Sequence, residues 1–381
     1  MADIWHFSRP ELAAGYLNFF GSGISNALLL FAKRRAGKTE FLLQDLAPAA
    51  EHLGYRVVYA SFWQSPLSPA AVLLYHLEKS LQSKSLAERL GQFLTAPVTR
   101  LKLSGSLPGA KGEAEIELSE VRGAPPADLL LYLDDLFGRL ARSRRRLLLM
   151  LDEVQELGID AGNRPLVTAL RTSLDKYRNQ VSVVFTGSSR EGLTRMFSAR
   201  EAPFFHFATQ IELPPLDESF VRHIVRTFHS LGRRRLDEAK AMEAFRTVGS
   251  NPYYFRKVIE ILLAAVADDI PGAIAQLRQR LPEEQGYTRL WIGLRPLDRE
   301  VLALLASGER SVFSRPSRKW LGERLEIREP DPAAVQSALR RLLSARIVLK
   351  TENQGSYQFE DPEFAEWVRR ASSVLRAKRR R

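Results

Sequence analysis

Ala27-Leu28-Leu29-Leu30-Phe31 runs directly into Ala32-Lys33-Arg34-Arg35-Ala36-Gly37-Lys38-Thr39, and this stretch decides the fold. Its short apolar run is typical of a strand buried on both faces of a sheet. The residues after it match the phosphate-binding pattern G-x-x-x-x-G-K-S/T at every fixed position except the first, where Ala32 replaces glycine. Helical periodicity follows from Glu40 to Leu46, and we predict that this helix stops before Pro48. The order is therefore strand, loop and helix.

The loop has the chemistry of an anion site. A loop at a helix N-terminus points backbone N–H groups at an anion, and the helix dipole adds to the attraction. Lys38 would reach the β- and γ-phosphates of a nucleotide, and the Thr39 hydroxyl would ligate Mg²⁺. Gly37 permits close approach of the backbone, and we expect the small Ala32 to have only a mild effect. The alternative is a chance Gly-Lys-Thr at a helix start. The predicted nucleotide-binding residues of this stretch are Ala32, Lys33, Arg34, Arg35, Ala36, Gly37, Lys38, Thr39 and Glu40.

A second apolar run, Leu147 to Leu151, ends in the acidic pair Asp152-Glu153. Ligands of open parallel sheets bind at the carboxyl ends of the strands. Asp152 would hold Mg²⁺ through water, because Mg²⁺ keeps several waters in proteins. Glu153 would orient and polarise an attacking water. An acidic pair after a strand is common on surfaces, but the phosphate loop earlier in the chain favours a magnesium site.

Strands alternate with helices in the first half of the chain. Further strands are predicted at Arg56–Phe62 and Val181–Thr186, which implies an α/β fold with a parallel sheet covered on both faces. The predicted helices lie at 69–94, 127–141 and 163–177. Alternating apolar and polar residues on both sides of Pro108-Gly109 predict an inserted hairpin at about 98–119.

Strand patterns stop after Pro214-Pro215. The chain is then helical from Asp217 to about Gln279, with breaks at Gly249–Pro252 and around 281–286. From Pro296 the pattern predicts three short helices and a hairpin, at 297–306, 317–325, 332–345 and 347–360. We therefore predict three parts, at 1–215, 216–285 and 290–381.

Composition excludes several classes of protein. A chain of 381 residues with 45% hydrophobic residues predicts two or three folded domains. The absence of cysteine excludes a disulfide scaffold, a thiol nucleophile, an iron–sulfur cluster and a cysteine-ligated zinc site. His206, His223 and His229 lack metal-ligand spacing and are interpreted as structural. Without a signal-like start or an apolar run near 20 residues, we expect a soluble cytoplasmic protein with no membrane partner.

The chain is basic, with 56 Lys and Arg against 44 Asp and Glu, a net charge of +12. From Leu290 to the end there are 19 Lys and Arg against 12 Asp and Glu, so +7 of that excess lies in the last quarter. The densest cluster is Arg376 with Lys378–Arg381. Such a tail is most often solvated and mobile, and nucleic-acid contact is the alternative. The charge predicts anionic partners: nucleotide, nucleic acid or a membrane surface.

Five motifs occur in the order of a known family. The segments are Lys33–Thr39, Leu151–Leu157, Phe185–Ser189, Gly249–Tyr254 and Phe359–Phe364. Together they resemble the archaeal-type ATPase family, in the AAA+/STAND branch of P-loop NTPases. The resemblance implies a P-loop ATPase core at 1–215, a helical lid at 216–285 and a winged-helix domain at 290–381. It also implies that Pro252, in the lid turn, meets the adenine or the phosphates of ATP. The chain departs from the family at Ala32 and, near the start, at Phe7–Leu12.

Several side chains are candidates for sensing the γ-phosphate. Thr186 and Ser188, at the tip of the fourth strand, would bond the γ-phosphate or the attacking water, and ordinary turn chemistry is the equal alternative. A cation at the γ-phosphate stabilises transition-state charge. Arg200 is a candidate arginine finger acting in trans, and Arg256 a candidate sensor in cis. Each arginine also fits an ordinary surface position.

The helix predicted at 332–345 has two distinct faces. Its apolar positions form one stripe: Val335, Ala338, Leu339, Leu342 and Leu343. The opposite face carries Gln336, Ser337, Arg340 and Arg341, and the preceding helix adds Arg318 and Lys319. Arginine and glutamine suit base edges, and serine and arginine suit phosphates. These residues predict contact with double-stranded DNA, while the alternative is a winged helix that binds protein.

The leading hypothesis is a Mg²⁺-dependent ATPase that acts as a nucleotide-driven switch on DNA, in a replication or mobile-element transaction. The alternative is a signalling or regulatory switch whose winged helix binds protein. A metabolic kinase is disfavoured because it has no obvious use for the Asp-Glu pair or the C-terminal pattern. Homo-oligomer formation is left open.

Overall fold

The computed structural model describes residues 3–65, 68–81, 100–103, 114–117, 127–158, 160–188, 190–198, 200–232, 235–264, 269–309, 311–350 and 357–379. The chain forms two compact units. The N-terminal unit comprises Ser8–Ala32 and Gly37–Pro214. The C-terminal unit comprises Met1–Phe7, Lys33–Ala36 and Pro215–Arg381.

The N-terminal unit is built on a five-stranded parallel sheet in the order β2-β5-β6-β1-β7. The strands are β1 (Ala27–Phe31), β2 (Arg56–Ser61), β5 (Leu147–Asp152), β6 (Val181–Gly187) and β7 (Thr209–Glu212). The predicted α/β class and parallel sheet are confirmed. Strand β7 was not predicted from the sequence, because this edge strand is largely exposed and carries no apolar run.

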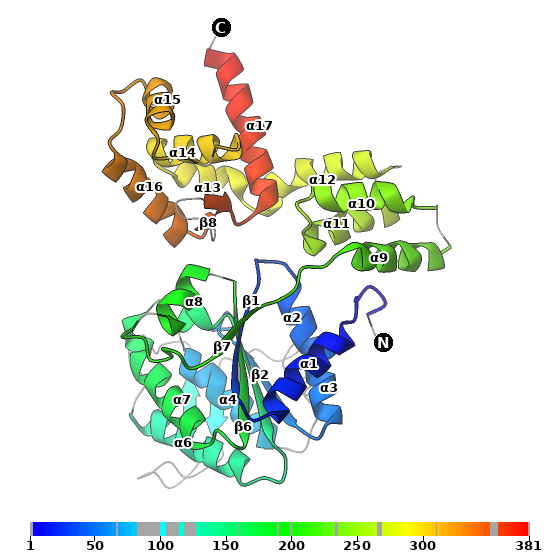
Figure 1. The fold of residues 1–381 in the computed structure, drawn as a ribbon, viewed down its shortest axis with the longest axis vertical. Coiled ribbons are helices and arrows are strands. Elements are labelled where there is room, and N and C mark those ends of the chain that lie inside the picture. The colour runs from blue at the N-terminus through cyan, green and yellow to red at the C-terminus, as the bar shows by residue number, and fades with distance from the viewer. Residues whose placement is uncertain are drawn as a thin grey trace. The chain divides into compact units, whose positions relative to one another are not determined.

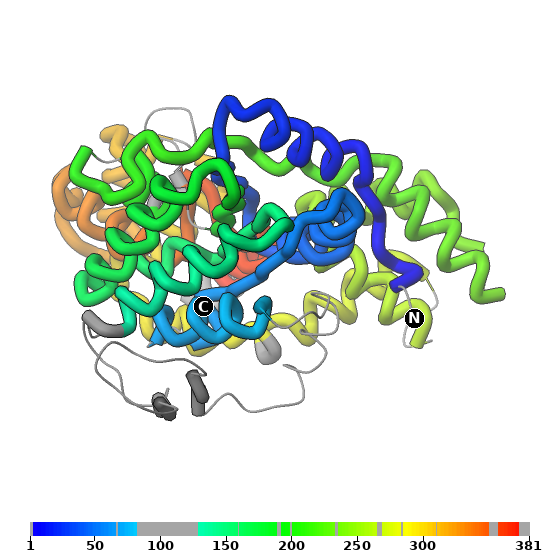
Figure 2. The backbone as a smooth tube through the Cα atoms, turned by 90° about the horizontal axis from the view of Figure 1, so that it is seen from below, coloured from blue at the N-terminus to red at the C-terminus, as the bar shows by residue number. Residues whose placement is uncertain are grey.

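Helices cover both faces of the sheet. Figure 1 shows α1 (Pro10–Gly21) and α3 (Ala47–His52) on one face, and α6 (Ala127–Ala141) and α7 (Arg164–Lys176) on the other. Figures 1 and 2 show α6 and α7 side by side. The strand side chains alternate accordingly. One set packs with α6 and α7 in a single core, and it includes Leu29, Val58, Leu149, Leu151 and Phe185.

The helical run after the phosphate loop continues through Pro48, so the predicted stop before this residue is wrong. The run comprises α2 (Lys38–Glu40), a π-helical turn (Phe41–Leu46) and α3. In a regular α-helix a proline ring clashes with the carbonyl four residues earlier. Here the N–H of Ala47 bonds to the carbonyl of Leu42, five residues back, and this wider turn lets the helix pass the proline.

Three further elements complete the N-terminal unit. They are α4 (Pro69–Leu81), α8 (Arg190–Phe197) and an antiparallel hairpin of β3 (Arg100–Leu103) and β4 (Ala114–Glu117). The hairpin confirms that part of the sequence prediction, whereas α8 was not predicted. The rest of the predicted 69–94 helix lies outside the described residues.

The C-terminal unit is almost entirely helical. Four helices come first: α9 (Glu218–Ser230), α10 (Glu238–Thr247), α11 (Pro252–Leu263) and α12 (Ile270–Glu284). The remaining elements are α13 (Tyr287–Gly293), α14 (Pro296–Ala306), α15 (Arg315–Leu325), α16 (Pro332–Ser344), β8 (Val348–Lys350), β9 (Tyr357–Phe359) and α17 (Pro362–Arg379). Helix α12 passes through Pro282 and ends at Glu284, so the break before α13 lies at the end of the predicted 281–286 range.

Helix α17 was not predicted from the sequence. It extends through Arg379 and inserts Phe364 and Val368 into the core that all the helices of this unit share. The charged residues near its end obscure this apolar pattern in the sequence. Among the described residues, no helix is both long and apolar enough to cross a membrane.

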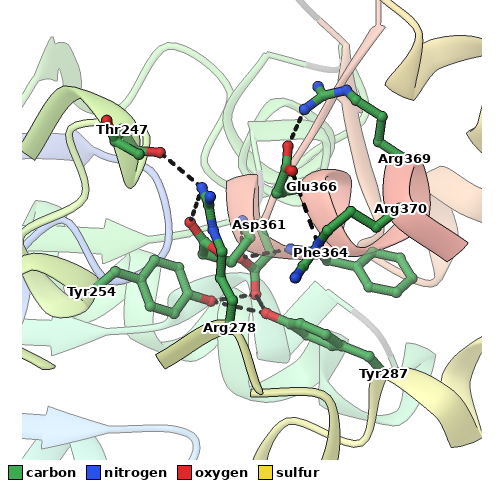
Figure 3. Close-up of polar contacts among 10 residues, drawn as sticks. Thr247, Tyr254, Arg278, Tyr287, Asp361, Phe364, Glu366, Arg369 and Arg370 are labelled. Carbon is green, nitrogen blue, oxygen red and sulfur yellow. Dashed lines mark hydrogen bonds and ion pairs between the residues drawn. The ribbon is translucent and has the colours of Figure 1, made fainter. Parts of the chain in front are cut away.

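A polar cluster joins four helices of this unit. Figure 3 shows the hydroxyl groups of Tyr254 (α11) and Tyr287 (α13) pointing at the Asp361 carboxylate. They donate to Oδ2 of Asp361 at 2.5 and 2.8 Å. Oδ1 of Asp361 accepts the backbone N–H of Glu363 at 3.0 Å and so caps α17. The Glu363 carboxylate in turn accepts from Arg278 of α12 at 3.1 Å.

Candidate functional site

The phosphate loop connects β1 to α2 through two residues in the left-handed region, Arg35 (φ 62°) and Gly37 (φ 85°). Ala32 is not among the described residues with positive φ, so the absent glycine is not needed for the backbone at this position. The Lys38 side chain is buried, and its Nζ donates to the carbonyl of Ala32 at 3.2 Å. The lysine is therefore folded back over the loop.

Asp152, at the carboxyl end of β5, is surrounded by hydroxyl groups. Its Oδ2 accepts from Thr39 Oγ1 and from Tyr59 OH, each at 2.9 Å. Its Oδ1 accepts from Thr186 Oγ1 and from the backbone N–H of Glu153 at 3.0 Å. Burial, and then the negative charge of Asp152, raise the pKa of Tyr59 well above its ordinary value of 10.0, so this phenol stays a donor.

Glu153 follows in an unusual backbone conformation, with φ at 55°. Its Oε2 accepts from Ser188 Oγ at 2.8 Å, from the Ser188 backbone N–H at 3.3 Å and from Gln155 Nε2. Its Oε1 lies 4.0 Å from Lys38 Nζ. The two carboxylates thus have separate partners, and only Glu153 faces the lysine.

The oxygen set suits Mg²⁺. The described residues contain no group of three or more His, Cys, Asp or Glu side chains that could hold a metal ion. A cation held by Asp152 and the Thr39 hydroxyl would need phosphate oxygens and waters to complete its shell. Mg²⁺ typically binds in this way, through one or two protein oxygens and a nucleotide. The residues present therefore fit a nucleotide-linked Mg²⁺.

Thr186 and Ser188 both contact the acidic pair. Thr186 is fully buried and donates to Asp152, and Ser188 is 1% exposed and donates to Glu153. Both hydroxyls therefore orient the carboxylates in this structure. Their expected bonds to the γ-phosphate or the attacking water stay predictions.

The other residues predicted to bind the nucleotide differ in their exposure and in their hydrogen-bond partners. Lys33, Arg34 and Glu40 are exposed. Arg35 belongs to the C-terminal unit, where its guanidinium donates to Tyr254, to Gln285 and, at 3.3 Å, to Asp361. Its side chain is thus bonded within that unit, and the prediction that it serves the nucleotide is restricted to its backbone.

The structure also gives the surroundings of Pro252 in the lid turn, of Arg256 and of Arg200. Pro252 is the first residue of α11, which Asn251 caps through the N–H of Tyr253 at 3.0 Å. Arg256 pairs with Asp3 at 3.4 Å within the C-terminal unit. Arg200 is exposed. Among the described residues, no contact of these side chains identifies a sensor or an arginine finger.

Helix α16 has the two faces that its sequence predicts, since its apolar stripe is buried and Gln336, Ser337 and Arg340 are exposed. Two members of the predicted nucleic-acid set form ion pairs within the unit. Arg341 forms a two-bond ion pair with the buried Asp298 of α14, at 2.5 and 3.0 Å. Arg318 pairs with Glu329 at 2.8 Å and also donates to two backbone carbonyls. Both arginines stabilise the fold, whereas Lys319 is exposed.

Two residues of the site were missed from the sequence. Tyr59 lies inside the predicted strand at 56–62 and Gln155 lies in the acidic motif, and neither has an assigned role. A polar atom at the same end of a neighbouring parallel strand is the signal that would have found Tyr59, since Ser61 of β2 pairs with Asp152 of β5.

Comparison with known proteins identifies the family. The sequence profile of a family described as an ATPase domain predominantly from Archaea matches residues 17–258. The chain belongs to this family. No curated protein sequence matches the chain.

Solved structures confirm the fold of this ATPase. A Walker-type ATPase of Pyrococcus abyssi superposes with a TM-score of 0.64 at 16% identity, over 96% of this chain and all of its own. The ORC2 protein of Aeropyrum pernix, in ADPNP–ADP complexes, gives 0.54 at 18% identity over 97% of this chain and 93% of its own. Its ADP form gives 0.52 at 16% identity, over 98% of this chain and 97% of its own. The chain is thus an archaeal-type P-loop ATPase that hydrolyses ATP.

Proposed function

We propose that the ATPase acts with Mg²⁺ at the Lys38–Asp152–Glu153 site. The observation that carries this proposal is the shared contact of Thr39 and Asp152, since it joins the hydroxyl and the carboxylate that hold Mg²⁺ in P-loop enzymes. When bound with ATP, Mg²⁺ would neutralise charge on the phosphate oxygens.

The protein groups change partners in this mechanism. Thr39 and Asp152 would hold the cation, and Lys38 Nζ would exchange the Ala32 carbonyl for the β- and γ-phosphates. Glu153 uses Oε1, the oxygen that faces the lysine, to orient the attacking water and to polarise its O–H bond. Tyr59 and Thr186 continue to donate to Asp152 and keep its orientation fixed.

Two variants test this assignment. Lys38→Ala should lower both nucleotide affinity and ATP turnover, the latter more than about a hundredfold because phosphate charge loses its cation. Glu153→Gln should retain ATP binding and trap the bound nucleotide, since only the water-orienting carboxylate is removed. Turnover and the dissociation constant of a fluorescent ATP analogue distinguish these outcomes. Unchanged turnover in Lys38→Ala would refute the site.

We propose further that α14–α16 with β8 and β9 form a winged helix that binds double-stranded DNA. The ATPase would then be a STAND-type switch in a replication or mobile-element transaction. The exposed Gln336, Ser337, Arg340 and Lys319 support this assignment, as does the basic last quarter of the chain. A helix that presents arginine and glutamine to solvent suits the major groove.

The internal ion pairs of Arg318 and Arg341 favour the second candidate, a switch whose winged helix binds protein. They reduce the positive charge that the face offers to DNA phosphates. Duplex affinity measured against salt separates the two functions. If the face binds DNA, Arg340→Gln and Lys319→Gln should each make the log–log slope less steep by about one, because one phosphate no longer meets a cation. A slope near zero in the unchanged protein would favour the protein-binding switch.

The same proposal includes a domain division at 216–285 and 290–381. It also assigns a cis sensor role to Arg256 and a trans arginine-finger role to Arg200. An arginine finger in trans requires a second copy of the chain. Mixing inactive Glu153→Gln with inactive Arg200→Ala should restore part of the turnover, because one mixed interface contains both intact groups. Absence of such rescue at a concentration where copies associate would exclude Arg200.

A further inference from the structure

We propose that Gln155 is a positioning residue for hydrolysis, which holds the Glu153 carboxylate so that Oε1 meets the attacking water. This inference rests on the proposed role of Glu153 as the group that orients that water. Gln155 does not contact Lys38, Thr39 or Asp152 in any hydrogen bond among the described residues. Its effect on the reaction would therefore pass through Glu153.

The Gln155 amide is buried and has a defined orientation. The side chain is 2% exposed, and its Nε2 donates to Glu153 Oε2 and, at 3.4 Å, to Glu156 Oε1. Two carboxylate oxygens on one side of the amide require its NH₂ group there, because a carbonyl oxygen would be repelled. The chemistry thus fixes which end of the amide meets Glu153.

Gly187 leaves space for this amide. A Cβ atom at Gly187 would lie 2.2 Å from Gln155 Oε1, which is closer than atoms approach without a bond. It would also lie 2.9 Å from a methyl group of Leu193. The φ angle of Gly187 is not positive. The close approach of the Gln155 amide therefore explains the glycine better than its backbone conformation does.

The two carboxylate oxygens of Glu153 have different partners. Oε2 accepts from Gln155 and twice from Ser188, whereas Oε1 has no hydrogen bond among the described residues and faces Lys38 Nζ at 4.0 Å. Three donors on one oxygen prevent rotation of the carboxylate. They also stabilise Glu153 in its left-handed backbone, a conformation that costs free energy without such support.

The unpartnered Oε1 of Gln155 is consistent with this role. It is buried without a hydrogen-bond partner, so this end of the amide adds no stabilising bond to the fold. A nonpolar side chain of similar length would satisfy a purely structural requirement at this position. The retained amide is explained by the bond that it donates to Glu153.

Gln155→Met is the decisive variant because methionine keeps the length and flexibility of glutamine but cannot donate. We expect turnover to fall about tenfold, the rate equivalent of one hydrogen bond to a charged group. The dissociation constant for a fluorescent ATP analogue should remain unchanged. The exposed Gln180→Met is the matched control and should retain both values. Full turnover in Gln155→Met would overturn the proposal.

A double-mutant cycle separates positioning from a packing role. In the Glu153→Gln background, Gln155→Met should cause no further loss in single-turnover rate, because its effect passes through the missing carboxylate. An equal loss in both backgrounds would mean that Gln155 only packs. Gly187→Ala should lower turnover like Gln155→Met, and it should add little to that variant, since both displace the same amide.

Failure of this inference and failure of the proposed site have different signatures. If Glu153→Gln itself keeps full turnover, the assignment of Glu153 is wrong. If Glu153→Gln is inactive while Gln155→Met is fully active, the assignment of Glu153 holds and the positioning role of Gln155 is wrong. Thermal unfolding of each variant identifies any that fail to fold, and the Gly187→Ala variant then provides the second route to the same measurement.

Discussion

Asp152 in the N-terminal unit and Asp361 in the C-terminal unit have similar surroundings. Each carboxylate accepts hydroxyl groups from distant parts of its unit and a backbone N–H from the residues that follow it. The donors differ in kind, since Asp152 faces two threonines and one tyrosine, whereas Asp361 faces two tyrosines and Arg35.

The difference separates a reactive carboxylate from a structural one. The Thr39 hydroxyl belongs to a phosphate loop and has alternative partners in a nucleotide and its cation. Tyr254 and Tyr287 are buried phenols in a packed core, and a buried hydroxyl without a partner costs free energy. Under the proposed mechanism Asp152 would serve a bound cation, whereas Asp361 stabilises the fold through the hydroxyl groups that it keeps.

Substitution of Asp152 tests one side of this comparison and has the largest expected effect. Asp152→Asn should lower ATP turnover by about a hundredfold or more, because it removes the charge that would hold Mg²⁺. The free energy of unfolding should change less than in Asp361→Asn, since the weaker acceptance from Tyr59 and Thr186 is offset by relief of the repulsion between Asp152 and the adjacent Glu153. Steady-state turnover and urea unfolding measure the two quantities. A large loss of stability would mean that Asp152 is structural like Asp361.

Substitution of Asp361 should have the opposite character. We expect Asp361→Asn to lower the free energy of unfolding by about 2–3 kcal/mol, because both tyrosine hydroxyls lose a charged acceptor. The matched control is Asp331→Asn, at the exposed cap of α16, where asparagine replaces aspartate as a cap at little cost. Equal effects of the two substitutions on urea unfolding would show that capping, and not the tyrosine contacts, accounts for the role of Asp361.

Alkaline pH should destabilise the Asp361 cluster. Burial, and then the charge of Asp361, raise the pKa of Tyr254 and of Tyr287 well above 10.0. The unfolded chain therefore loses these protons first as the pH rises, so folding stability falls from about pH 10 upward. Each proton contributes about 1.4 kcal/mol per pH unit in this window. Tyr287→Phe should reduce the pH slope of unfolding, and an unchanged slope would contradict the assignment.

Local patterns predicted the reactive cluster far better than the structural one. Lys38 and Thr39 lie in one loop, and Asp152 ends an apolar strand, so the rules for strand ends and phosphate loops place them together. Tyr254, Tyr287 and Asp361 have no shared spacing, because their contact depends on how α11, α13 and α17 pack. The same limit applies to β7. This strand has no apolar run in the sequence, and only its pairing with β1 in the structure identifies it.

Neighbouring arginines on α16 show the limit of helical periodicity most directly. Arg340 and Arg341 both lie opposite the apolar stripe in projection, but Arg341 follows the buried Ala338 by three residues and precedes Leu342. Its long side chain can therefore reach back over the core edge to Asp298, which is 2% exposed. Periodicity describes where a Cβ atom points, whereas the guanidinium lies several bonds away.

Substitutions of Arg340 and Arg341 have the smallest expected effects. They also add a third carboxylate, Asp298, to the comparison of Asp152 with Asp361. Arg341→Gln should lower the free energy of unfolding by about 1–3 kcal/mol, since Asp298 becomes a buried charge without its ion pair. Arg340→Gln should change it by less than about 0.5 kcal/mol, as for other exposed substitutions. In duplex binding the order should reverse, because Arg340 is the residue exposed to a phosphate. Both substitutions could instead weaken DNA binding equally without loss of stability. That result would mean that the Arg341–Asp298 ion pair opens on DNA. Asp298 would then resemble Asp152 as a carboxylate that changes partners.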